Sequence, residues 1–265
     1  SCGIYYGNSM FGTITEFEEH PWLTMIRHDK FRDSRIYCGG VLISSRYVLT
    51  AAHCVDVLNL PQNGKATHVR LGEWNTSSVI DCVWGDCNQP PLDVPVEEVV
   101  LHEDYAGHDG NQQNDIALLR LAYDVTFSDF VKPICLPIDT SLAQKTFEGY
   151  NLEVAGWGNT DTNQFLSAVK QKARLSVQNN SVCSQIYMMY DIDITEKHIC
   201  AGKVFSEDPC TGDSGGPLMV KINGNWMVLG VESYSPSPCG TANRWPGVYT
   251  KVTAFVDWIL SKLRP

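Results

Sequence analysis

A serine in the stretch DPCTGDSGGP, Asp208 to Pro217, has surroundings that suit a nucleophile. The glycines beside Ser214 let the backbone turn sharply and leave amide groups pointing outward. In acyl transfer such amides stabilise the oxyanion that forms when a serine attacks a carbonyl group, by about 3 kcal/mol per donor. The serine also needs a base to take its proton and an acidic group to orient that base.

His53 and Asp115 are candidates for those two roles. His53 follows small residues in LTAAHC, which leave room for its imidazole, and Asp115 leads the apolar run in NDIALL. The three residues follow the order His, Asp, Ser along the chain. The other histidines lack such surroundings, and we expect them to be surface or hydrogen-bonded core residues: His20, His28, His68, His102, His108 and His198.

Short runs rich in β-branched and aromatic residues recur along the chain and would position these side chains. Gly, Pro, Asn and Asp clusters separate them, which is the pattern of strands joined by loops in an antiparallel barrel or sandwich. The clearest runs are Cys38 to Ala52, His68 to Gly72, Ile116 to Leu121, Leu152 to Gly158 and Trp226 to Tyr234. The pattern predicts an all-β fold.

Two further segments interrupt or end this pattern. Prolines break strand-like sequence between Phe127 and Thr140, which we interpret as the connection between two halves. Near the C-terminus, Thr253 can cap a helix over residues 254–263. One face of that helix carries apolar residues four positions apart, Phe255, Ile259 and Leu263.

Composition excludes several classes of function. The 265 residues include 20 basic and 30 acidic ones, a formal net charge of −10, and no Lys/Arg run stands out. We therefore expect neither nucleic acid nor an anionic membrane surface as a partner, whereas a basic substrate would be attracted. No apolar run approaches the roughly 18 residues of a membrane helix, and no leader precedes Ser1, so we expect a soluble, processed product.

The cysteines indicate an extracellular protein. Ten of them are spread along the chain without a CxxC pair or a His/Cys cluster at metal-ligand spacing. An even, scattered set favours disulfides over reduced cytosolic thiols. Sequons at Asn75 and Asn179 agree with secretion and predict glycosylation.

The motifs LTAAHC, NDIALL and GDSGGP, in this order, resemble the chymotrypsin and trypsin family of serine endopeptidases. The resemblance covers nearly the whole chain and implies two six-stranded antiparallel β-barrels with the active site between them, followed by a C-terminal α-helix. It divides one peptidase domain into a tail over residues 1–8, an N-terminal barrel over 9–128 and a C-terminal barrel with the helix over 129–265.

The resemblance also implies roles for the residues introduced above. His53 would be the general base and then the general acid, Asp115 its orienting carboxylate and Ser214 the nucleophile. The backbone amides of Gly212 and Ser214 would form the oxyanion hole. Four disulfides are implied, Cys2–Cys135, Cys38–Cys54, Cys183–Cys200 and Cys210–Cys239. The remaining pair, Cys82 and Cys87, would form a short local bridge, and this pair resembles the catalytic domains of arthropod clip-domain proteases.

The specificity pocket agrees with the family in one position and departs from it in two. Asp208, six residues before Ser214, matches the aspartate that selects Arg or Lys in trypsin-like members. The pocket wall would be Glu232, Ser233, Tyr234 and Ser235, where relatives carry a small apolar residue at the first position and glycine at the last. Glu232 either adds a second carboxylate, which would raise at least one pKa, or pairs with a basic group of the protein. We hypothesise weakened or narrowed selectivity for Arg and Lys.

The activation switch of the family is not recognisable. A new N-terminal ammonium group would pair with Asp213, yet the sequence near Ser9 reads SMFGT, the alternative at Ile4 reads IYYG, and the first basic residue is Arg27. Three hypotheses remain: activation by a protease of other specificity, an active-like state without cleavage, or a chain that never becomes a competent protease.

The segment GEWNTSSVID, Gly72 to Asp81, resembles a calcium-binding loop of some relatives. Glu73 and Asp81 would offer the hard oxygen ligands that Ca²⁺ takes, whereas Ile80 stands where trypsin-type loops carry an acid. The alternatives are a Ca²⁺ site and a plain surface loop, and no cofactor is required for the expected chemistry.

We therefore predict a secreted serine endopeptidase that cleaves after Arg or Lys in an extracellular cascade, such as those of immunity, development or clotting. Its expected partners are a protein substrate with an exposed Arg or Lys and a serpin-type inhibitor, and we expect a monomer. The alternative is a zymogen-locked or non-catalytic homologue that binds a protease, an inhibitor or a haemostatic partner.

Overall fold

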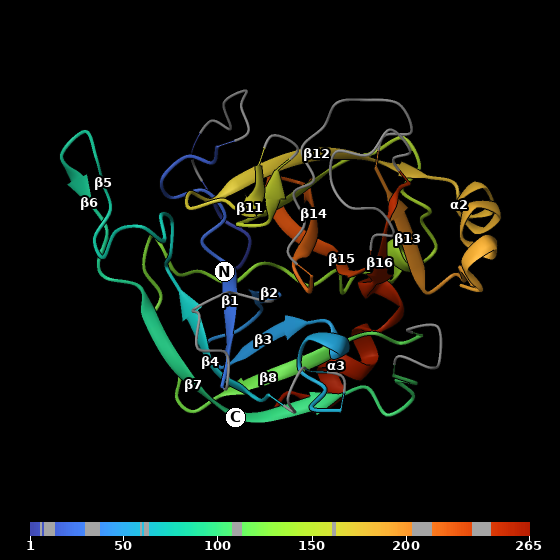
Figure 1. The fold of residues 1–265 in the computed structure, drawn as a ribbon, viewed down its shortest axis with the longest axis horizontal. Coiled ribbons are helices and arrows are strands. Elements are labelled where there is room, and N and C mark those ends of the chain that lie inside the picture. The colour runs from blue at the N-terminus through green and yellow to red at the C-terminus, as the bar shows by residue number, and fades with distance from the viewer. Residues whose placement is uncertain are drawn as a thin grey trace.

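The strands of the protein form two closed antiparallel barrels (Figure 1). The computed structural model describes residues 1–5, 7, 14–29, 38–58, 60, 64–107, 113–160, 163–202, 214–234 and 245–265. In these residues, no helix has the length and apolar character needed to cross a membrane. Six strands in each barrel and the helix at the C-terminus confirm the predicted fold class.

The N-terminal barrel has the strand order β1-β2-β3-β8-β7-β4, and β4 pairs with β1 to close it. Its strands are β1 (Leu23–His28), β2 (Cys38–Leu42), β3 (Tyr47–Thr50), β4 (Ala66–Leu71), β7 (Leu92–Leu101) and β8 (Ala117–Leu121). Between β4 and β7, a small hairpin of β5 (Cys82–Val83) and β6 (Asp86–Cys87) projects from the barrel.

The C-terminal barrel has the strand order β12-β13-β16-β15-β14-β9. Its strands are β9 (Asn151–Gly156), β12 (Gln171–Gln178), β13 (His198–Ala201), β14 (Pro217–Ile222), β15 (Asn225–Tyr234) and β16 (Gly247–Lys251). A separate hairpin contains β10 (Asn159–Thr160) and β11 (Asn163–Leu166). The proline-containing connection at 127–140 runs between β8 and β9, while the division of the chain at residue 128 stays a prediction.

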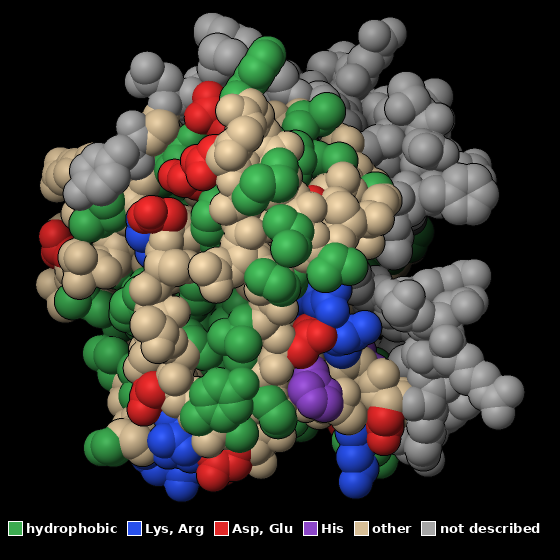
Figure 2. All heavy atoms as spheres, turned by 90° about the vertical axis from the view of Figure 1, so that its left-hand side faces the viewer, with side chains coloured by type: hydrophobic (Ala, Val, Ile, Leu, Met, Phe, Trp, Pro, Cys, Tyr) green, Lys and Arg blue, Asp and Glu red, His purple; other side chains and the backbone are tan. Residues whose placement is uncertain are grey.

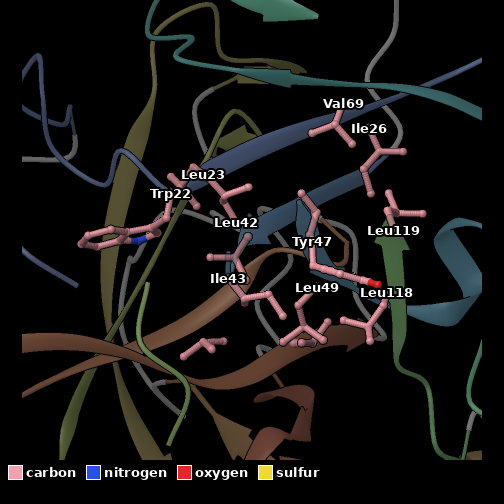
Figure 3. Packing of buried hydrophobic residues seen from close by; sticks show 14 of the residues in the cluster. Trp22, Leu23, Ile26, Leu42, Ile43, Tyr47, Leu49, Val69, Leu118 and Leu119 are labelled. Atoms are coloured by element: carbon pink, nitrogen blue, oxygen red, sulfur yellow. The ribbon is translucent and has the colours of Figure 1, made fainter. Parts of the chain in front are cut away.

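One buried apolar cluster fills the N-terminal barrel and reaches into the second barrel, which also has a separate cluster around Leu152, Leu218 and Leu229. Successive side chains of a strand alternate between its two faces, and in β2, β3 and much of β8 both faces are buried, so consecutive residues such as Leu118 and Leu119 are both inaccessible to solvent. Figure 3 shows ten residues of the first cluster side by side: Trp22, Leu23, Ile26, Leu42, Ile43, Tyr47, Leu49, Val69, Leu118 and Leu119. The same cluster continues through Met219 and Val231 of the second barrel to Ile259. Each fully buried Leu or Ile contributes about 1.5–3 kcal/mol to the stability of the fold. Because this cluster contains residues of both barrels, each barrel stabilises the other.

The helices are short and lie in the connections or, for the last one, at the C-terminus. They are α1 (Thr140–Ala143), α2 (Asn180–Tyr187) and α3 (Val256–Lys262), with 3₁₀ turns η1 (Ala52–Cys54), η4 (Met188–Tyr190) and η5 (Val252–Ala254). The predicted cap of the last helix is wrong. Thr253 lies within η5, its hydroxyl is buried without a hydrogen-bond partner in the described structure, and α3 begins only at Val256. The apolar face is confirmed, because Phe255 and Ile259 are buried in the core.

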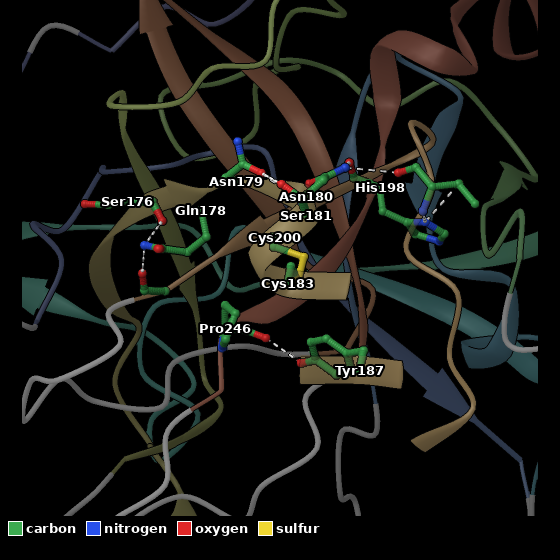
Figure 4. Close-up of a disulfide and its surroundings, with 12 residues drawn as sticks. Ser176, Gln178, Asn179, Asn180, Ser181, Cys183, Tyr187, His198, Cys200 and Pro246 are labelled. Atoms are coloured by element: carbon green, nitrogen blue, oxygen red, sulfur yellow. Dashed lines mark hydrogen bonds between the residues drawn. A yellow bond between two sulfur atoms is a disulfide. The ribbon is translucent and has the colours of Figure 1, made fainter. Parts of the chain in front are cut away.

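Four predicted disulfides are present: Cys2–Cys135, Cys38–Cys54, Cys82–Cys87 and Cys183–Cys200. Cys210 and Cys239 lie outside the described residues. Figure 4 shows the Cys183–Cys200 bond between α2 and β13. The helix α2 was not predicted, although Asn179 provides a recognisable start, since its side chain accepts a hydrogen bond from the Ser181 amide at 2.8 Å.

The N-terminal tail is joined to the C-terminal barrel by more than its disulfide. The Gly3 amide donates to the Pro133 carbonyl at 2.8 Å, and the Trp226 amide donates to the Gly3 carbonyl at 2.9 Å. Gly3 has φ of +63°, and a Cβ atom there would overlap the Trp226 backbone, so only glycine fits this position.

Charged side chains are intermixed on the surface. On the face shown in Figure 2, Lys and Arg side chains lie in small separate groups, each next to Asp or Glu, rather than in a continuous band. Basic and acidic side chains also form ion pairs on the surface, such as Lys132–Asp129 at 2.7 Å and Arg27–Asp93 at 2.8 Å.

Candidate active site

The pairing of β3 with β8 brings His53 and Asp115 together. These strands are antiparallel, with Thr50 opposite Ala117, so the residues just after β3 lie beside the residues just before β8. The Asp115 carboxylate accepts two hydrogen bonds from His53, at 2.9 Å from the backbone amide and 2.7 Å from Nδ1. The imidazole is thereby held in one orientation, with Nδ1 bonded to the acid and Nε2 turned to the other side of the ring.

The second barrel completes the surroundings of Asp115. The Ser233 hydroxyl of β15 donates to Asp115 Oδ2 at 2.5 Å, and the Thr250 hydroxyl of β16 donates to the Asp115 carbonyl at 2.8 Å. Asp115 itself is fully buried. A buried carboxylate is costly unless hydrogen-bonded, and this one accepts from His53 of the first barrel and Ser233 of the second. Ser233, expected in the pocket wall, thus has a contact with the acid that sequence reasoning missed.

The protonation of His53 is governed by opposing effects. Burial lowers the pKa of the imidazole, but the charge and hydrogen bond of Asp115, together with the charge of Glu232, raise it above the ordinary value. The nearby His198 behaves differently, because burial lowers its pKa to about 4 against the opposing charge of Asp115. His198 is therefore neutral at physiological pH, as expected of a buried histidine whose Nδ1 accepts from the Thr195 amide at 3.1 Å.

Ser214 is placed by its backbone against the segment that carries His53. The Gly39 amide donates to the Ser214 carbonyl at 2.8 Å, and Sγ of Cys54 lies 3.3 Å from the same oxygen. The following residue, Gly215, has φ of +80°, and a Cβ atom there would lie 2.7 Å from the Gly39 carbonyl and closer still to the Thr50 hydroxyl. Only glycine fits this position, which explains one of the glycines of the GDSGGP motif.

The strand β15, which carries three residues of the predicted pocket wall, is hydrogen-bonded to the segment that follows Ser214. The Gly215 amide donates to the Glu232 carbonyl at 2.8 Å, and the Glu232 amide donates to the Gly216 carbonyl at 2.9 Å. Glu232 lies opposite Tyr249 of β16. Burial raises the pKa of the Tyr249 hydroxyl, and the charge of Glu232 raises it further, so this carboxylate lies within electrostatic reach of both Tyr249 and His53.

Several predicted site residues lie outside the described part of the chain. These are Asp208, Gly212, Asp213 and Ser235, which were assigned to the specificity pocket, the oxyanion hole and the activation switch. Their roles stay predictions. Tyr234, the remaining residue of the predicted wall, is described, and its ring packs edge-to-face on Tyr187 with centroids 5.4 Å apart.

The predicted calcium ligands already have hydrogen-bond donors. Glu73 accepts from Arg70 Nη1 at 3.2 Å and from the Trp74 amide at 3.0 Å. Asp81 accepts from the Asn75 amide at 3.0 Å and from the Ser78 hydroxyl. Within the described residues, the two acids belong to no group of three close metal-ligating side chains. Ca²⁺ takes six to eight oxygen ligands, so these residues fit the ion poorly.

The paired His53 and Asp115, the adjacent Ser214 segment and the two barrels define a class of protein. The family model described as Trypsin matches residues 11–259, and the chain belongs to this family of serine proteases.

Individual relatives narrow the comparison to insect clip proteases. The chain is 53% identical to CLIP domain-containing serine protease HP8 of Bombyx mori, over 99% of this chain and 71% of that protein. It is 42% identical to Spaetzle-processing enzyme of Drosophila melanogaster, over 100% of this chain and 68% of that protein. The crystal structure of the Drosophila Grass clip serine protease of the Toll pathway superimposes with a TM-score of 0.85 at 34% identity, covering 98% of this chain and 73% of the other. The predicted resemblance is thus confirmed.

Proposed function

We propose that this protein is a secreted serine endopeptidase that hydrolyses peptide bonds after Arg or Lys in an extracellular proteolytic cascade. The observation that carries the proposal is the His53 imidazole, held by the buried Asp115 carboxylate, next to the segment of Ser214. The disulfides support an extracellular location. Relatives named Melanization protease 1 and Spaetzle-processing enzyme support a role in a cascade.

In the proposed reaction His53 first accepts a proton and then donates it. Its Nε2 takes the Ser214 proton while the serine oxygen attacks the substrate carbonyl carbon, and the resulting imidazolium is stabilised by Asp115. The imidazolium then gives the proton to the leaving amine, which leaves an acyl group on Ser214. Water, deprotonated by the same imidazole, hydrolyses this ester and restores the free hydroxyl.

The substrate preference follows from the acidic pocket. An Asp208 carboxylate at the base of the pocket favours the cationic side chain of Arg or Lys, because a buried charge left unpaired is costly. We further propose that Glu232, which has no acidic counterpart in the family pattern, weakens or narrows the selectivity for Arg and Lys side chains. A serpin-type inhibitor that presents the same side chain fits the same pocket.

A specific feature of the sequence favours a second candidate function. Residues 1–26 contain no Lys or Arg, so a trypsin-like activator has no bond to cut within this segment. A zymogen-locked or non-catalytic homologue, acting through binding to a protease or an inhibitor, would keep the same fold and the same His53–Asp115 pair.

Labelling with a fluorophosphonate distinguishes the two functions. The endopeptidase hypothesis predicts covalent labelling of the secreted protein that is lost in Ser214→Ala, together with turnover of arginyl substrates. If every processed form of the protein isolated from its natural fluid stays unlabelled, that result supports the binding function. The N-terminal residue of the secreted form, determined on the same sample, tells whether processing has occurred.

A further inference from the structure

The turn of the β5–β6 hairpin carries a tryptophan that contributes nothing to the core. Trp84 is 100% exposed, and its side chain has no ring contact or hydrogen bond with the described residues. Positive φ at both Trp84 and Gly85 marks a two-residue type I′ turn, in which Asn-Gly is favoured and a bulky first residue is strained. The tryptophan thus costs stability at a position where it buries no surface of the protein itself.

The hairpin holds this ring in a fixed place outside the barrel. The Cys82–Cys87 disulfide joins the two strands, and Val83 pairs with Asp86 directly before and after the turn. Figure 1 shows the hairpin at the edge of the molecule, beyond the strands of the N-terminal barrel. A ring that is already held in place loses little freedom when a partner covers it, and tryptophan is among the residues that contribute most to protein–protein affinity.

A cavity of about 480 Å³ lies between this hairpin and the N-terminal segment. Its lining includes Val83, Trp84 and Asp86 of the hairpin. Side chains from other segments complete it, among them Tyr5, Glu16, Phe17, Glu18, Asp129 and Lys132. None of His53, Asp115 and Ser214 lines this cavity, so it is separate from the catalytic groups. Its volume is sufficient for a long side chain of another protein.

The aromatic residues that line the cavity from the N-terminal segment are held by contacts of their own. Phe17 packs edge-to-face on Trp74 and on Phe130, with ring centroids 5.4 and 4.9 Å apart. The Tyr5 hydroxyl donates to Glu16 Oε2 at 2.5 Å, which orients that carboxylate. The cavity is therefore formed before any partner binds, which favours affinity.

Acids outnumber bases among the described residues of the lining. The acids are Glu16, Glu18, Asp86 and Asp129 and the base is Lys132, so 4 − 1 leaves three negative charges. Lys132 is itself bound by Asp129 at 2.7 Å. The neighbouring Glu19 does not line the cavity and is bound by Lys172 at 2.7 Å. Within the described residues, the carboxylates of Glu18 and Asp86 have no ion-pair partner.

Aromatic rings next to carboxylates suit one kind of side chain. A guanidinium or ammonium group is attracted both to the face of a tryptophan and to a carboxylate. An apolar side chain would remove water from the carboxylates without replacing its hydrogen bonds, and an acidic side chain would be repelled. The charge and the rings together favour Arg or Lys.

We propose that Trp84 and the adjoining cavity form an exosite, a binding site outside the catalytic groups, for a basic segment of a partner protein. A Lys or Arg side chain of that segment enters the cavity, where its cation contacts the Trp84 ring and pairs with Glu18 and Asp86. The site acts by binding alone, so it serves a protein substrate of the endopeptidase and a partner of a non-catalytic homologue equally.

Fluorescence anisotropy of a fluorescein-labelled hexa-arginine peptide tests the proposal. The whole chain with Ser214→Ala serves as the parent, so that the peptide is bound and not cleaved. We expect saturable binding to the parent, and none of a hexa-glutamate peptide. Trp84→Asn removes the ring but creates the favoured Asn-Gly turn, so the hairpin should keep its fold while the affinity falls about tenfold. The control is Leu58→Asn, at another exposed apolar residue, and should bind as the parent does.

A second pair of variants tests the charge of the cavity. Glu18→Gln combined with Asp86→Asn should weaken binding about tenfold. Asp104→Asn combined with Asp257→Asn changes the net charge of the protein equally, at exposed acids outside the cavity, and should weaken binding by less than about twofold.

Three results would overturn the proposal. The parent might show no saturable binding of hexa-arginine, or either site variant might bind it as tightly as its control does. In the latter case the attraction would come from the overall charge of −10 rather than from this site. If the double variant at Glu18 and Asp86 does not fold, the comparison of Trp84→Asn with Leu58→Asn decides.

Discussion

At the scale of single residues, the carboxylate of Asp115 organises the site. It accepts from His53 on one side and from Ser233 on the other, so the acid is satisfied only when both barrels are in place. The His, Asp and Ser motifs were sufficient to predict the first of these contacts. The second could not be predicted, because the ladder between β15 and β16 shifts its register between Glu232 and Tyr234, and no local pattern reveals which side chain then faces Asp115.

Loss of the Ser233 hydroxyl should weaken catalysis without unfolding the protein. Ser233→Ala removes one of the hydrogen bonds that hold the Asp115 carboxylate, and a bond to a charged group contributes about 1.5–3 kcal/mol. We expect kcat/KM for an arginyl substrate to fall at least about tenfold, and the melting temperature to fall by several degrees while the protein stays folded at 25 °C. Ser141→Ala, at an exposed position of α1, is the control. Equal kcat/KM in both variants would contradict the inferred role.

Replacement of Glu232 should change the pH dependence of activity. His53 must be neutral to accept the Ser214 proton, so a raised pKa makes activity fall as the pH decreases through a value above 6.5. Glu232→Gln removes one of the charges that raise this pKa, and the acidic limb of kcat/KM should move to lower pH. A limb that stays in place, measured over the same buffers, would show that the Glu232 charge does not act on His53.

At the scale of elements, the antiparallel strands β3 and β8 and the turn after Ser214 determine where the catalytic groups meet. Runs rich in β-branched and aromatic residues predicted β3, β8 and β15, and their pairing explains why distant residues converge. The hairpin of β5 and β6 was less predictable. Its turn places Trp84 and Gly85 at φ of 53° and 88°, and a tryptophan is an unusual residue for the first of these conformations. Only the short spacing of Cys82 and Cys87 indicated a local bridge.

The turn after Ser214 should tolerate no side chain. Gly215→Ala adds a Cβ atom that overlaps the Thr50 hydroxyl and the Gly39 carbonyl, so the Ser214 segment must shift and covalent labelling should be lost. Gly224→Ala is a matched control, because Gly224 has a similar φ of +86° and open space around it. That control should cost about 1 kcal/mol of stability and leave labelling intact. Labelling of Gly215→Ala at the wild-type rate would refute this account.

At the scale of the whole molecule, buried charges connect the N-terminal segment to the second barrel. Glu19 is fully buried and bound by Lys172 of β12, and His20 Nε2 lies 2.6 Å from Glu153 of β9. The motifs predicted the two barrels, the strand content and four described disulfides. They did not predict these contacts, because Lys172 and Glu19 are 153 residues apart and each resembles a surface residue in its local sequence.

The contributions of Glu19 and Lys172 to the free energy of unfolding should be strongly coupled. Lys172→Met leaves the Glu19 carboxylate buried without its cation, and we expect the free energy of unfolding in urea to fall by about 3–5 kcal/mol. Adding Glu19→Gln to this variant should restore part of the loss, since the uncompensated charge is removed. Additive effects of the two substitutions would show that the carboxylate and the ammonium group do not depend on each other.

The attachment of residues 1–3 has a practical consequence for detecting proteolysis. A protease that cuts the chain between Gly7 and Ile14 would produce two polypeptides that remain covalently joined through Cys2 and Cys135. On an electrophoretic gel without reductant, intact and nicked molecules would run together, and a mass spectrum would differ by one water. Reduction would release the polypeptide that carries Cys2, and its C-terminal residue would identify the bond that was cut.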